Sequence, residues 1–288
     1  MKNKERIDRK ATRIAATESG LRKAWGQSLH VESLEARQMM AGDVSVSING
    51  NGDLFVIGDG ADNNVDISTD LITGDLIIAG NEGTNIVFDG ESANTQVISL
   101  ETDFTLGRNL TINMRGGDDE VRVDHLDVVS DVTAVLGSGD DTLDLSGFTS
   151  AVWISLGYSG TELWTKDTGE AITVTGPWRE MATVTGIDHI TGTGYDDWIS
   201  GDAGGNLLDG GGGSDHFVFY DGHGADRING FDALDNGEVI DLSAVTAITS
   251  FADLVNNHMT QQGSDVVIVA LEALVRTNVA LEHLLFAN

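Results

Sequence analysis

Two aspartates, Asp197 and Asp215, lie eighteen residues apart in a stretch whose residue types repeat every nine positions. The stretch covers residues 192–218 and reads GTGYDDWIS, GDAGGNLLD, GGGGSDHFV, and both aspartates hold the sixth place of their unit. A short internal period indicates one small structural unit that is stacked repeatedly. If two units complete one turn of a coil, the two carboxylates face each other across neighbouring strands, about 4.8 Å apart. Calcium binds carboxylate and carbonyl oxygens at about 2.3–2.6 Å, so this spacing predicts a site for that ion.

The rest of each unit predicts how the aspartates are held. Glycine runs such as 210–213 suit a turn, because glycine adopts left-handed backbone conformations at little cost. The eighth place is apolar in every unit (Ile199, Leu208, Phe217), and the residues around it alternate, which is typical of a short strand with one buried face. Each unit is therefore a turn followed by a strand. A flexible glycine linker would keep neither the apolar place nor the acidic one.

The same spacing makes a cation close to obligatory. Two stacked carboxylates at roughly 5 Å repel each other by about 3 kcal/mol at an effective dielectric of about 20. The three units resemble the GGxGxDxUx repeat of RTX, or haemolysin-type, calcium-binding proteins, which form a parallel β-roll with calcium held between its turns. The resemblance implies that place-six carboxylates and turn carbonyls bind the metal. It carries onto Asp197 and Asp215 and onto the turn glycines Gly194, Gly204 and Gly213.

The repeat departs from the RTX pattern at two places. Tyr195 stands where a glycine is usual, and Asn206 replaces the aspartate of the middle unit. An asparagine offers a carbonyl oxygen without charge, so we expect weaker metal binding there, or none. A fourth unit, residues 221–229, places Asp226 at place six. Asn206 and Asp226 therefore form a second, poorer candidate site.

Composition favours a cation-binding protein and excludes other classes. The net charge is −30, yet residues 1–40 hold nine of the sixteen basic residues against five acids, so the remaining chain carries −34. Such an acidic body repels phosphate backbones, which argues against nucleic-acid binding. The absence of cysteine excludes a disulfide scaffold and a thiolate metal site. No segment reaches the eighteen or so apolar residues that a membrane span needs, so we expect no membrane insertion.

Four regions can be separated along the chain. Residues 1–42 are basic, contain helix formers and lack the apolar stretch of a signal peptide. Within them VESLEARQMMAG resembles the LEPR-type motif of some large secreted bacterial surface proteins, with Ala36 in place of its proline, and a disordered basic tail fits the composition equally well. Residues 43–190 read as acidic β-helix-like repeats, residues 191–230 as the calcium-binding β-roll, and residues 231–288 as a C-terminal cap with an export signal.

Region 43–190 carries a longer repeat and a group of tryptophans. Asp119 and Asp141 occupy matching places twenty-two residues apart, each followed by an alternating strand, which predicts a wider coil of the same type and further metal ligands. Tryptophans cluster at Trp153, Trp164, Trp178 and Trp198. We expect them to fill the core or cap the coil, and a sugar-stacking face is the alternative.

The C-terminal region resembles the cap of the serralysin-type β-roll, including the pattern FVFxxGxGxDxIxxFD that starts at Phe217. Ser250 followed by Asp253 predicts a capped helix start over residues 251–258. The ending Leu284, Leu285 and Phe286 resembles the uncleaved export signal of that family, and a final strand explains it as well. The predicted fold is all-β, a right-handed parallel β-helix or β-roll with a small C-terminal cap.

No catalytic motif accompanies the repeat. The sequence contains no HExxH, GxSxG nucleophile elbow, P-loop or dinucleotide-binding glycine motif. A polysaccharide lyase or epimerase on a β-helix would need a basic residue at its acidic substrate. The candidates, which no pattern assigns to one face, are Arg108, Arg115, Arg122, Lys166 and Arg179. We therefore expect no enzyme and no catalytic residues.

Together these features predict a secreted, calcium-binding RTX-type structural or adhesion protein that folds on meeting calcium outside the cell. The resemblance implies passage through a type I exporter and a place in the extracellular space or at the cell surface. Its expected partners are calcium ions and cell-surface polysaccharide or other surface proteins. The alternative is a carbohydrate-active enzyme of the lyase or epimerase type, or a sugar-binding module, on a β-helix.

Overall fold

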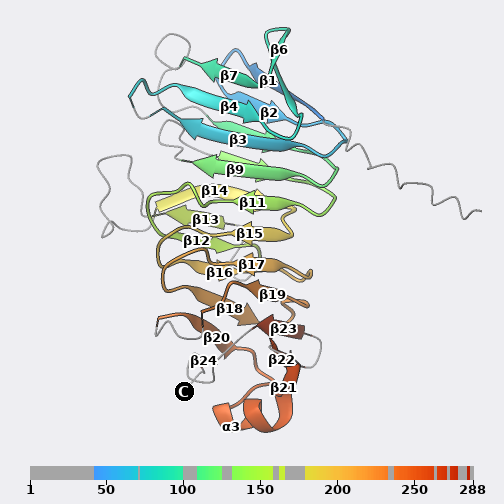
Figure 1. Ribbon diagram of the computed structural model, residues 1–288, viewed down its shortest axis with the longest axis vertical. Helices are drawn as coiled ribbons and strands as arrows, with labels where there is room; N and C mark the ends of the chain where they lie inside the picture. The colour runs from blue at the N-terminus through green and yellow to red at the C-terminus, as the bar shows by residue number, and fades with distance from the viewer. Residues whose placement is uncertain are drawn as a thin grey trace, which may run out of the picture. The chain divides into compact units, whose positions relative to one another are not determined.

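The described part of the protein is mostly β, with long sheets of largely parallel strands and one short α-helix (Figure 1). The computed structural model describes residues 42–70, 72–99, 109–124, 132–157, 162–165, 179–232, 237–262, 265–270, 273–277 and 284–285. The predicted segment 1–42 therefore lies outside the described residues apart from its last residue, as do Arg108, Lys166, Trp178 and Phe286.

The described residues form two sheets, which we call sheet A and sheet B, with 13 and 11 strands. Sheet A consists, in spatial order, of β24 (Leu284–Leu285), β20 (Val239–Ala244), β18 (His216–Tyr220), β16 (Trp198–Ser200), β12 (Val152–Ser155), β13 (Glu162–Thr165), β14 (Arg179–Thr185), β10 (Val132–Val135), β8 (Leu110–Asn113), β2 (Leu54–Ile57), β1 (Asp43–Ile48), β5 (Asn85–Phe88) and β6 (Glu91–Ala93). Sheet B consists of β21 (Met259–Gln262), β22 (Asp265–Ala270), β23 (Ala273–Thr277), β19 (Arg227–Asn229), β17 (Leu207–Asp209), β15 (His189–Thr191), β11 (Thr142–Asp144), β9 (Glu120–Asp124), β3 (Asn64–Thr69), β4 (Leu76–Gly80) and β7 (Thr95–Ile98).

From β14 to β20 the chain alternates between the sheets, one strand in each, so two consecutive strands make one rung. Strands of successive rungs pair in parallel, with Trp198 beside His216 in sheet A and His189 beside Leu207 in sheet B. Residues eighteen apart thus lie side by side, as the nine-residue period predicts. The chain crosses from sheet A to sheet B along one edge, the AB edge, and returns along the other, the BA edge.

Antiparallel pairs interrupt this parallel winding at five places among the described strands, and two of them are the simple pairs β1 with β2 and β5 with β6. Strand β4 pairs antiparallel with β3 and β7, strand β13 with β12 and β14, and strand β22 with β21 and β23. The sequence predicts a purely parallel coil, and this prediction is wrong for the segments that form antiparallel pairs. The hairpins occur where the nine-residue period is absent, so neighbouring segments return on themselves instead of advancing by one rung.

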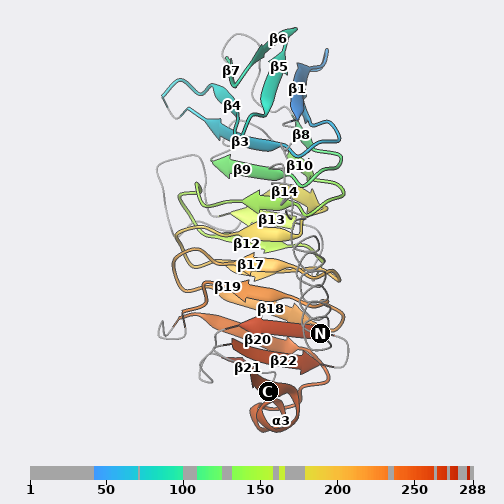
Figure 2. The ribbon, with the colours of Figure 1, turned by 45° about the vertical axis from the view of Figure 1, so that its right-hand side comes forward.

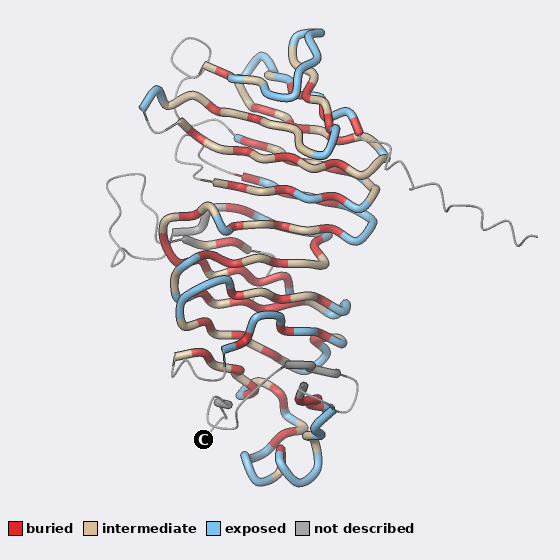
Figure 3. Tube along the Cα trace, in the orientation of Figure 1, coloured by how far each residue is buried: buried red, intermediate tan, exposed pale blue. Residues whose placement is uncertain are grey.

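The core lies between the two sheets and is built from alternate strand residues (Figure 3). The eighth-place residues Ile199, Leu208 and Phe217 are fully buried. Strand β18 shows why, since its side chains point alternately inward and outward and Phe219, two residues after Phe217, is buried as well. Each rung adds one such pair of inward faces, which fixes the turns at the edges in register.

The described tryptophans lie outside this core, so the prediction that they fill it is wrong. Trp164, Trp153, Trp198 and His216 are direct neighbours on four adjacent strands of sheet A, and all are half-buried on its outer face. The inner positions beside them belong to aliphatic residues such as Ile154. The rings of Trp198 and His216 stack with centroids 4.7 Å apart and an interplanar angle of 24°. This row is a cross-strand ladder of aromatic side chains.

The end of the described chain carries the predicted capping helix in shortened form. Ser250 caps α3 (Phe251–Asp253) by accepting a hydrogen bond from the Asp253 backbone, and a π-helical turn, η1 (Leu254–His258), follows. These elements lie at the end of the stack beyond β20 and β21 (Figure 2). Strand β24 pairs with β20, as a closing strand should. No helix among the described residues is long and apolar enough to cross a membrane.

Candidate metal centre

The predicted ligand pairs each meet on one edge of the stack. Asp197 and Asp215 end successive turns of the BA edge, just before β16 and β18. The other two pairs, Asn206 with Asp226 and Asp119 with Asp141, end turns of the AB edge. The nine-residue units therefore alternate between edges, and their ligands cannot form one continuous row.

Asp197 and Asp215 are completely buried and directly linked. The Asp197 backbone N–H donates to Asp215 Oδ1 at 2.9 Å. Asp197 itself is well supplied with donors, because its Oδ1 accepts from the backbone of Val152 at 2.8 Å and its Oδ2 from that of Thr193 at 2.6 Å. Asp215 Oδ2, in contrast, is buried and accepts no hydrogen bond from any described residue. One carboxylate oxygen of the pair is thus left without a donor.

The glycine at the first place of a unit is required by this arrangement. The place-six side chain folds back over the first residue of its own turn, so a Cβ on Gly210 would collide with Asp215 Oδ2. Gly201 stands in the same relation to Asn206 Oδ1. From the sequence alone, these glycines are attributed to left-handed backbone conformations in the turns. Positive φ angles are found instead at Gly211, with 84°, and at Gly213, with 115°.

The three glycines assigned to the metal site do not lie together. Gly194 and Gly213 belong to adjacent turns of the BA edge, where Gly213 packs against the backbone of Tyr195. Gly204 lies on the AB edge, and its carbonyl accepts a hydrogen bond from the Ala225 backbone at 3.3 Å. Gly204 is therefore part of the turn that ends in Asn206, and it does not belong to the site of Asp197 and Asp215.

Burial raises the pKa values of the two aspartates on the BA edge, Asp197 and Asp215. It raises the pKa of Asp215 to about 8, and the charges of Asp197, Glu238 and Asp196 act in the same direction. It also raises the pKa of Asp197 to about 7, against the hydrogen bonds from Thr193 and Val152. Desolvation penalises the charged form, so both groups hold protons near neutral pH unless a cation compensates them.

This donor set fits a hard divalent cation. A buried carboxylate oxygen without a hydrogen bond, next to a second carboxylate and glycine turns, offers the oxygen ligands that calcium prefers. Among the described residues no three acidic or histidine side chains converge as a metal cluster. The remaining ligands would have to be main-chain carbonyls of the turns, as the resemblance implies.

Asp119 and Asp141 belong to a longer row on the AB edge. The Asn63 backbone donates to Asp119 Oδ1 at 2.8 Å, the Asp119 backbone to Asp141 Oδ1 at 2.9 Å, and the Asp141 backbone to Asp188 Oδ2 at 3.1 Å. Asp119 Oδ2 and Asp141 Oδ2 are buried without a partner in the described part of the chain. Burial raises the pKa of Asp119 to about 6 and that of Asp141 above its ordinary value.

Sequence reasoning missed the outer partner of this row. The Asp118 backbone donates to Asp62 Oδ1 at 2.8 Å and the Asp140 backbone to Asp118 Oδ1 at 3.0 Å, so the fifth-place acids form a second, exposed row. The signal was a doublet of an acid followed by an acid or amide at the end of four turns. The doublets are Asp62-Asn63, Asp118-Asp119, Asp140-Asp141 and Asp196-Asp197.

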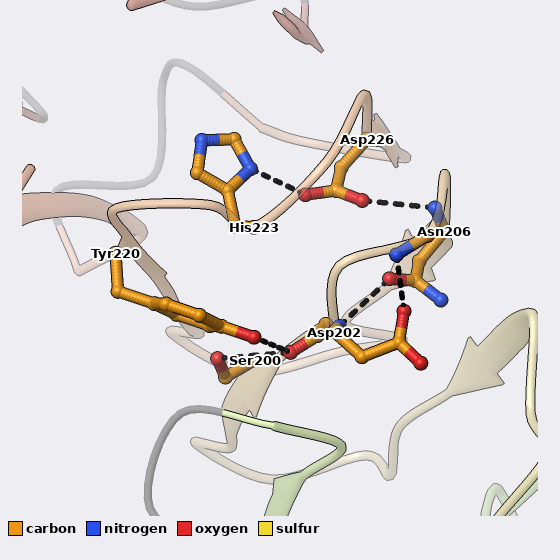
Figure 4. Close-up of polar contacts among 8 residues, drawn as sticks. Ser200, Asp202, Asn206, Tyr220, His223 and Asp226 are labelled. Carbon is orange, nitrogen blue, oxygen red and sulfur yellow. Dashed lines mark hydrogen bonds and ion pairs between the residues drawn. The ribbon is translucent and has the colours of Figure 1, made fainter. Parts of the chain in front are cut away.

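The turn that ends in Asp226 is different, because both carboxylate oxygens of Asp226 are paired (Figure 4). Asp226 Oδ1 accepts from the Asn206 backbone at 2.8 Å, and Asp226 Oδ2 lies 2.7 Å from His223 Nδ1. The Asn206 side chain accepts from the Asp202 backbone at 2.9 Å and donates to the Ile187 carbonyl at 3.3 Å. The sequence did not mark His223 as part of this site.

Comparisons with known proteins leave the family open. No family model and no curated protein matches the sequence. Among solved structures, the extracellular lipase LipA from Serratia marcescens is similar at 17% identity over 63% of this chain, with a TM-score of 0.26. The matched part spans 37% of that lipase. A likeness of this size carries no functional argument.

Proposed function

We propose that the protein is a secreted, calcium-binding protein of the RTX type, a right-handed β-roll whose folding is coupled to calcium outside the cell. The observation that carries the proposal is the buried pair Asp197 and Asp215, in which Asp215 Oδ2 accepts no hydrogen bond from the described residues. A second pair with the same property, Asp119 and Asp141, supports it on the opposite edge.

The chain's own residues define how calcium would act. The core places the carboxylates one rung apart in a dry edge, and the first-place glycines leave room for them. Calcium would supply the positive charge that the buried carboxylates lack. Extracellular calcium modules work at about 10⁻⁴ to 10⁻³ M. A ligand that binds only the folded state stabilises it, so the chain would stay loose where calcium is scarce and fold where it is plentiful.

The biological role that fits is a surface or matrix component, such as an adhesin, that is delivered by a type I exporter. The charge of −30 agrees with a cation-loaded scaffold. Its partners would be calcium and cell-surface polysaccharide or other surface proteins. We propose no catalytic activity.

One observation favours the second candidate, a sugar-binding module. Trp153, Trp164 and Trp198 stand half-exposed on the outer face of sheet A instead of in the core. The stacking of Trp198 on His216 argues against this role, because it covers a ring face that a sugar would need. A structural scaffold is therefore the better-supported function.

Calorimetric calcium titration of the wild type beside Asp215→Asn tests the proposal. We expect the variant to lose its tightest site, because the oxygen without a donor is removed. Glu91→Gln is the matched control, since Glu91 is an exposed acid in β6, an outermost strand of sheet A far along the strand order from β16 and β18. Circular dichroism with and without millimolar calcium reports folding in the same samples. Equal calcium binding by all three proteins would rule out the assignment.

A further inference from the structure

His223 and Asp226 form a closed pair inside the AB edge. Their side chains are 2% and 0% exposed, and His223 Nδ1 lies 2.7 Å from Asp226 Oδ2. The other carboxylate oxygen accepts the Asn206 backbone N–H. Asp226 therefore differs from Asp119, Asp141 and Asp215, each of which keeps one oxygen without a donor in the described parts of the chain.

The surroundings hold the imidazole in place. Its ring meets that of Phe219 edge to face, with centroids 4.8 Å apart, and that of Tyr220 at 6.4 Å. Gly222 and Gly224, on either side of His223, have φ angles of 87° and 89°, which non-glycine residues rarely adopt. The local sequence is thus built to turn the histidine inward.

The first place of this unit is also changed. Asp221 stands where the other three units have glycine, and its carboxylate accepts from the backbone and the hydroxyl of Thr246 at 2.9 and 2.6 Å. A residue with a Cβ at place one leaves no room for the place-six carboxylate to fold back, as Gly210 shows for Asp215. The Asp226 carboxylate instead meets the third-place histidine.

We propose that His223 takes the place of a metal ion at this turn. Its N–H group satisfies the buried Asp226 carboxylate, so this turn forms without calcium and does not bind it. Asn206 and Asp226 then act as a metal-independent rung next to rungs that need the ion. The inference rests on the proposed function and replaces the expectation of a second, poorer calcium site at Asn206 and Asp226.

His223→Ala tests the proposal in the full-length chain. The substitution leaves Asp226 as a buried carboxylate with a free oxygen, which is the condition of Asp215. We expect lower stability than wild type in chelator, recovery in millimolar calcium, and one more bound calcium than wild type by calorimetry. His223→Ala/Asp226→Asn is the matched control, and it should gain no calcium because the charge is gone.

His223→Gln provides a second variant if the alanine variant does not fold. Glutamine keeps a donor for Asp226, so we expect it to gain no calcium and to depend on calcium no more than the wild type does. A purely packing role for His223 predicts that calcium restores neither variant, and that result would overturn the proposal. A wild type that loses a bound calcium on Asp226→Asn would overturn it too.

The outcomes separate this inference from the proposed function. If the wild type binds no calcium but His223→Ala does, the proposed function fails and the role of His223 stands. If the wild type binds calcium and His223→Ala gains none, the proposed function stands and the role of His223 fails.

Discussion

The turns that end in Asp215 and Asp226 share one repeat and bury one carboxylate each, yet they treat it differently. Asp215 folds over a first-place glycine and keeps an oxygen that no described residue satisfies. Asp226 follows a first-place aspartate and is closed by His223. Two side chains, at places one and three, thus separate a turn whose buried carboxylate keeps an unsatisfied oxygen from one whose carboxylate is fully hydrogen-bonded. The comparison shows that a repeat position by itself does not determine how its buried carboxylate is satisfied.

Among these variants, removal of the Asp226 carboxylate should lower the free energy of unfolding most, because this carboxylate is fully hydrogen-bonded. Asp226→Ala leaves the Asn206 backbone N–H and the His223 ring without an acceptor, so we expect a loss of about 3 kcal/mol in the free energy of unfolding. The loss should be equal in chelator and in calcium. Urea unfolding in both solutions measures it. A loss that calcium increases would mean that Asp226 is a calcium ligand after all.

The second largest effect is expected in the pH dependence of the free energy of unfolding without calcium, which should come from the turns of Asp197 and Asp215. The pKa values of Asp197 and Asp215 in the folded state, about 7 and about 8, lie above the ordinary value of 3.8. The native state then binds more protons than the unfolded one, so stability is highest at acidic pH and falls as pH rises through 7 to 8.

We expect a fall on the order of 2 kcal/mol between pH 5 and pH 8 in chelator, from the usual 1.4 kcal/mol per unit of pKa shift after allowance for relaxation. Saturating calcium should flatten it, because metal binding needs the deprotonated carboxylates. Asp215→Asn should flatten it without calcium. Urea unfolding across this pH range checks both, and a stability that rises with pH in chelator would contradict the burial of these charges.

A methyl group at place one should disrupt the turn that ends in Asp215. Gly210→Ala collides with Asp215 Oδ2, so we expect a cost of about 2 kcal/mol and weaker calcium binding. Gly212→Ala is the control from the same turn, since its Cβ would lie 3.8 Å from the nearest atom, the Gly194 Cα. Thermal unfolding and calcium titration compare the pair. Identical behaviour of the two variants would show that the first-place contact is unimportant.

The smallest effect should come from the aromatic ladder, which belongs to neither edge. His216→Ser removes the stack on Trp198, worth about 1 kcal/mol, and should leave calcium affinity unchanged. The measurement is the midpoint of urea unfolding at several calcium concentrations. A shift in calcium affinity would show that the faces and the edges are coupled.

Some contacts were predictable from the sequence because the coil keeps its period there. Asp197 with Asp215 and Asp119 with Asp141 are eighteen and twenty-two residues apart, the lengths of single uninterrupted coils. The mostly β fold and the parallel pairing followed from the same period. Buried eighth-place residues such as Phe217 were predictable as well.

Other contacts could not be predicted from the repeat, because additional strands are inserted between the residues that meet. Asn63 meets Asp119 across 56 residues because β4 to β7 lie between them, and Asp141 meets Asp188 across 47 because β12 to β14 intervene. No repeat length spans such insertions. His223 was missed because its role depends on which way Asp226 turns, and that direction is set by contacts between rungs.

The hydrogen bonds from backbone to place-six carboxylate run in one direction. Between two place-six residues the donor always belongs to the earlier rung and the acceptor to a later one; the pairs are Asn63 and Asp119, Asp119 and Asp141, Asp141 and Asp188, Asp197 and Asp215, and Asn206 and Asp226. A turn therefore stays incomplete until the following rung has joined the stack. Truncation from the C-terminus strips the preceding backbone of its acceptor, whereas truncation from the N-terminus only opens a carboxylate to water.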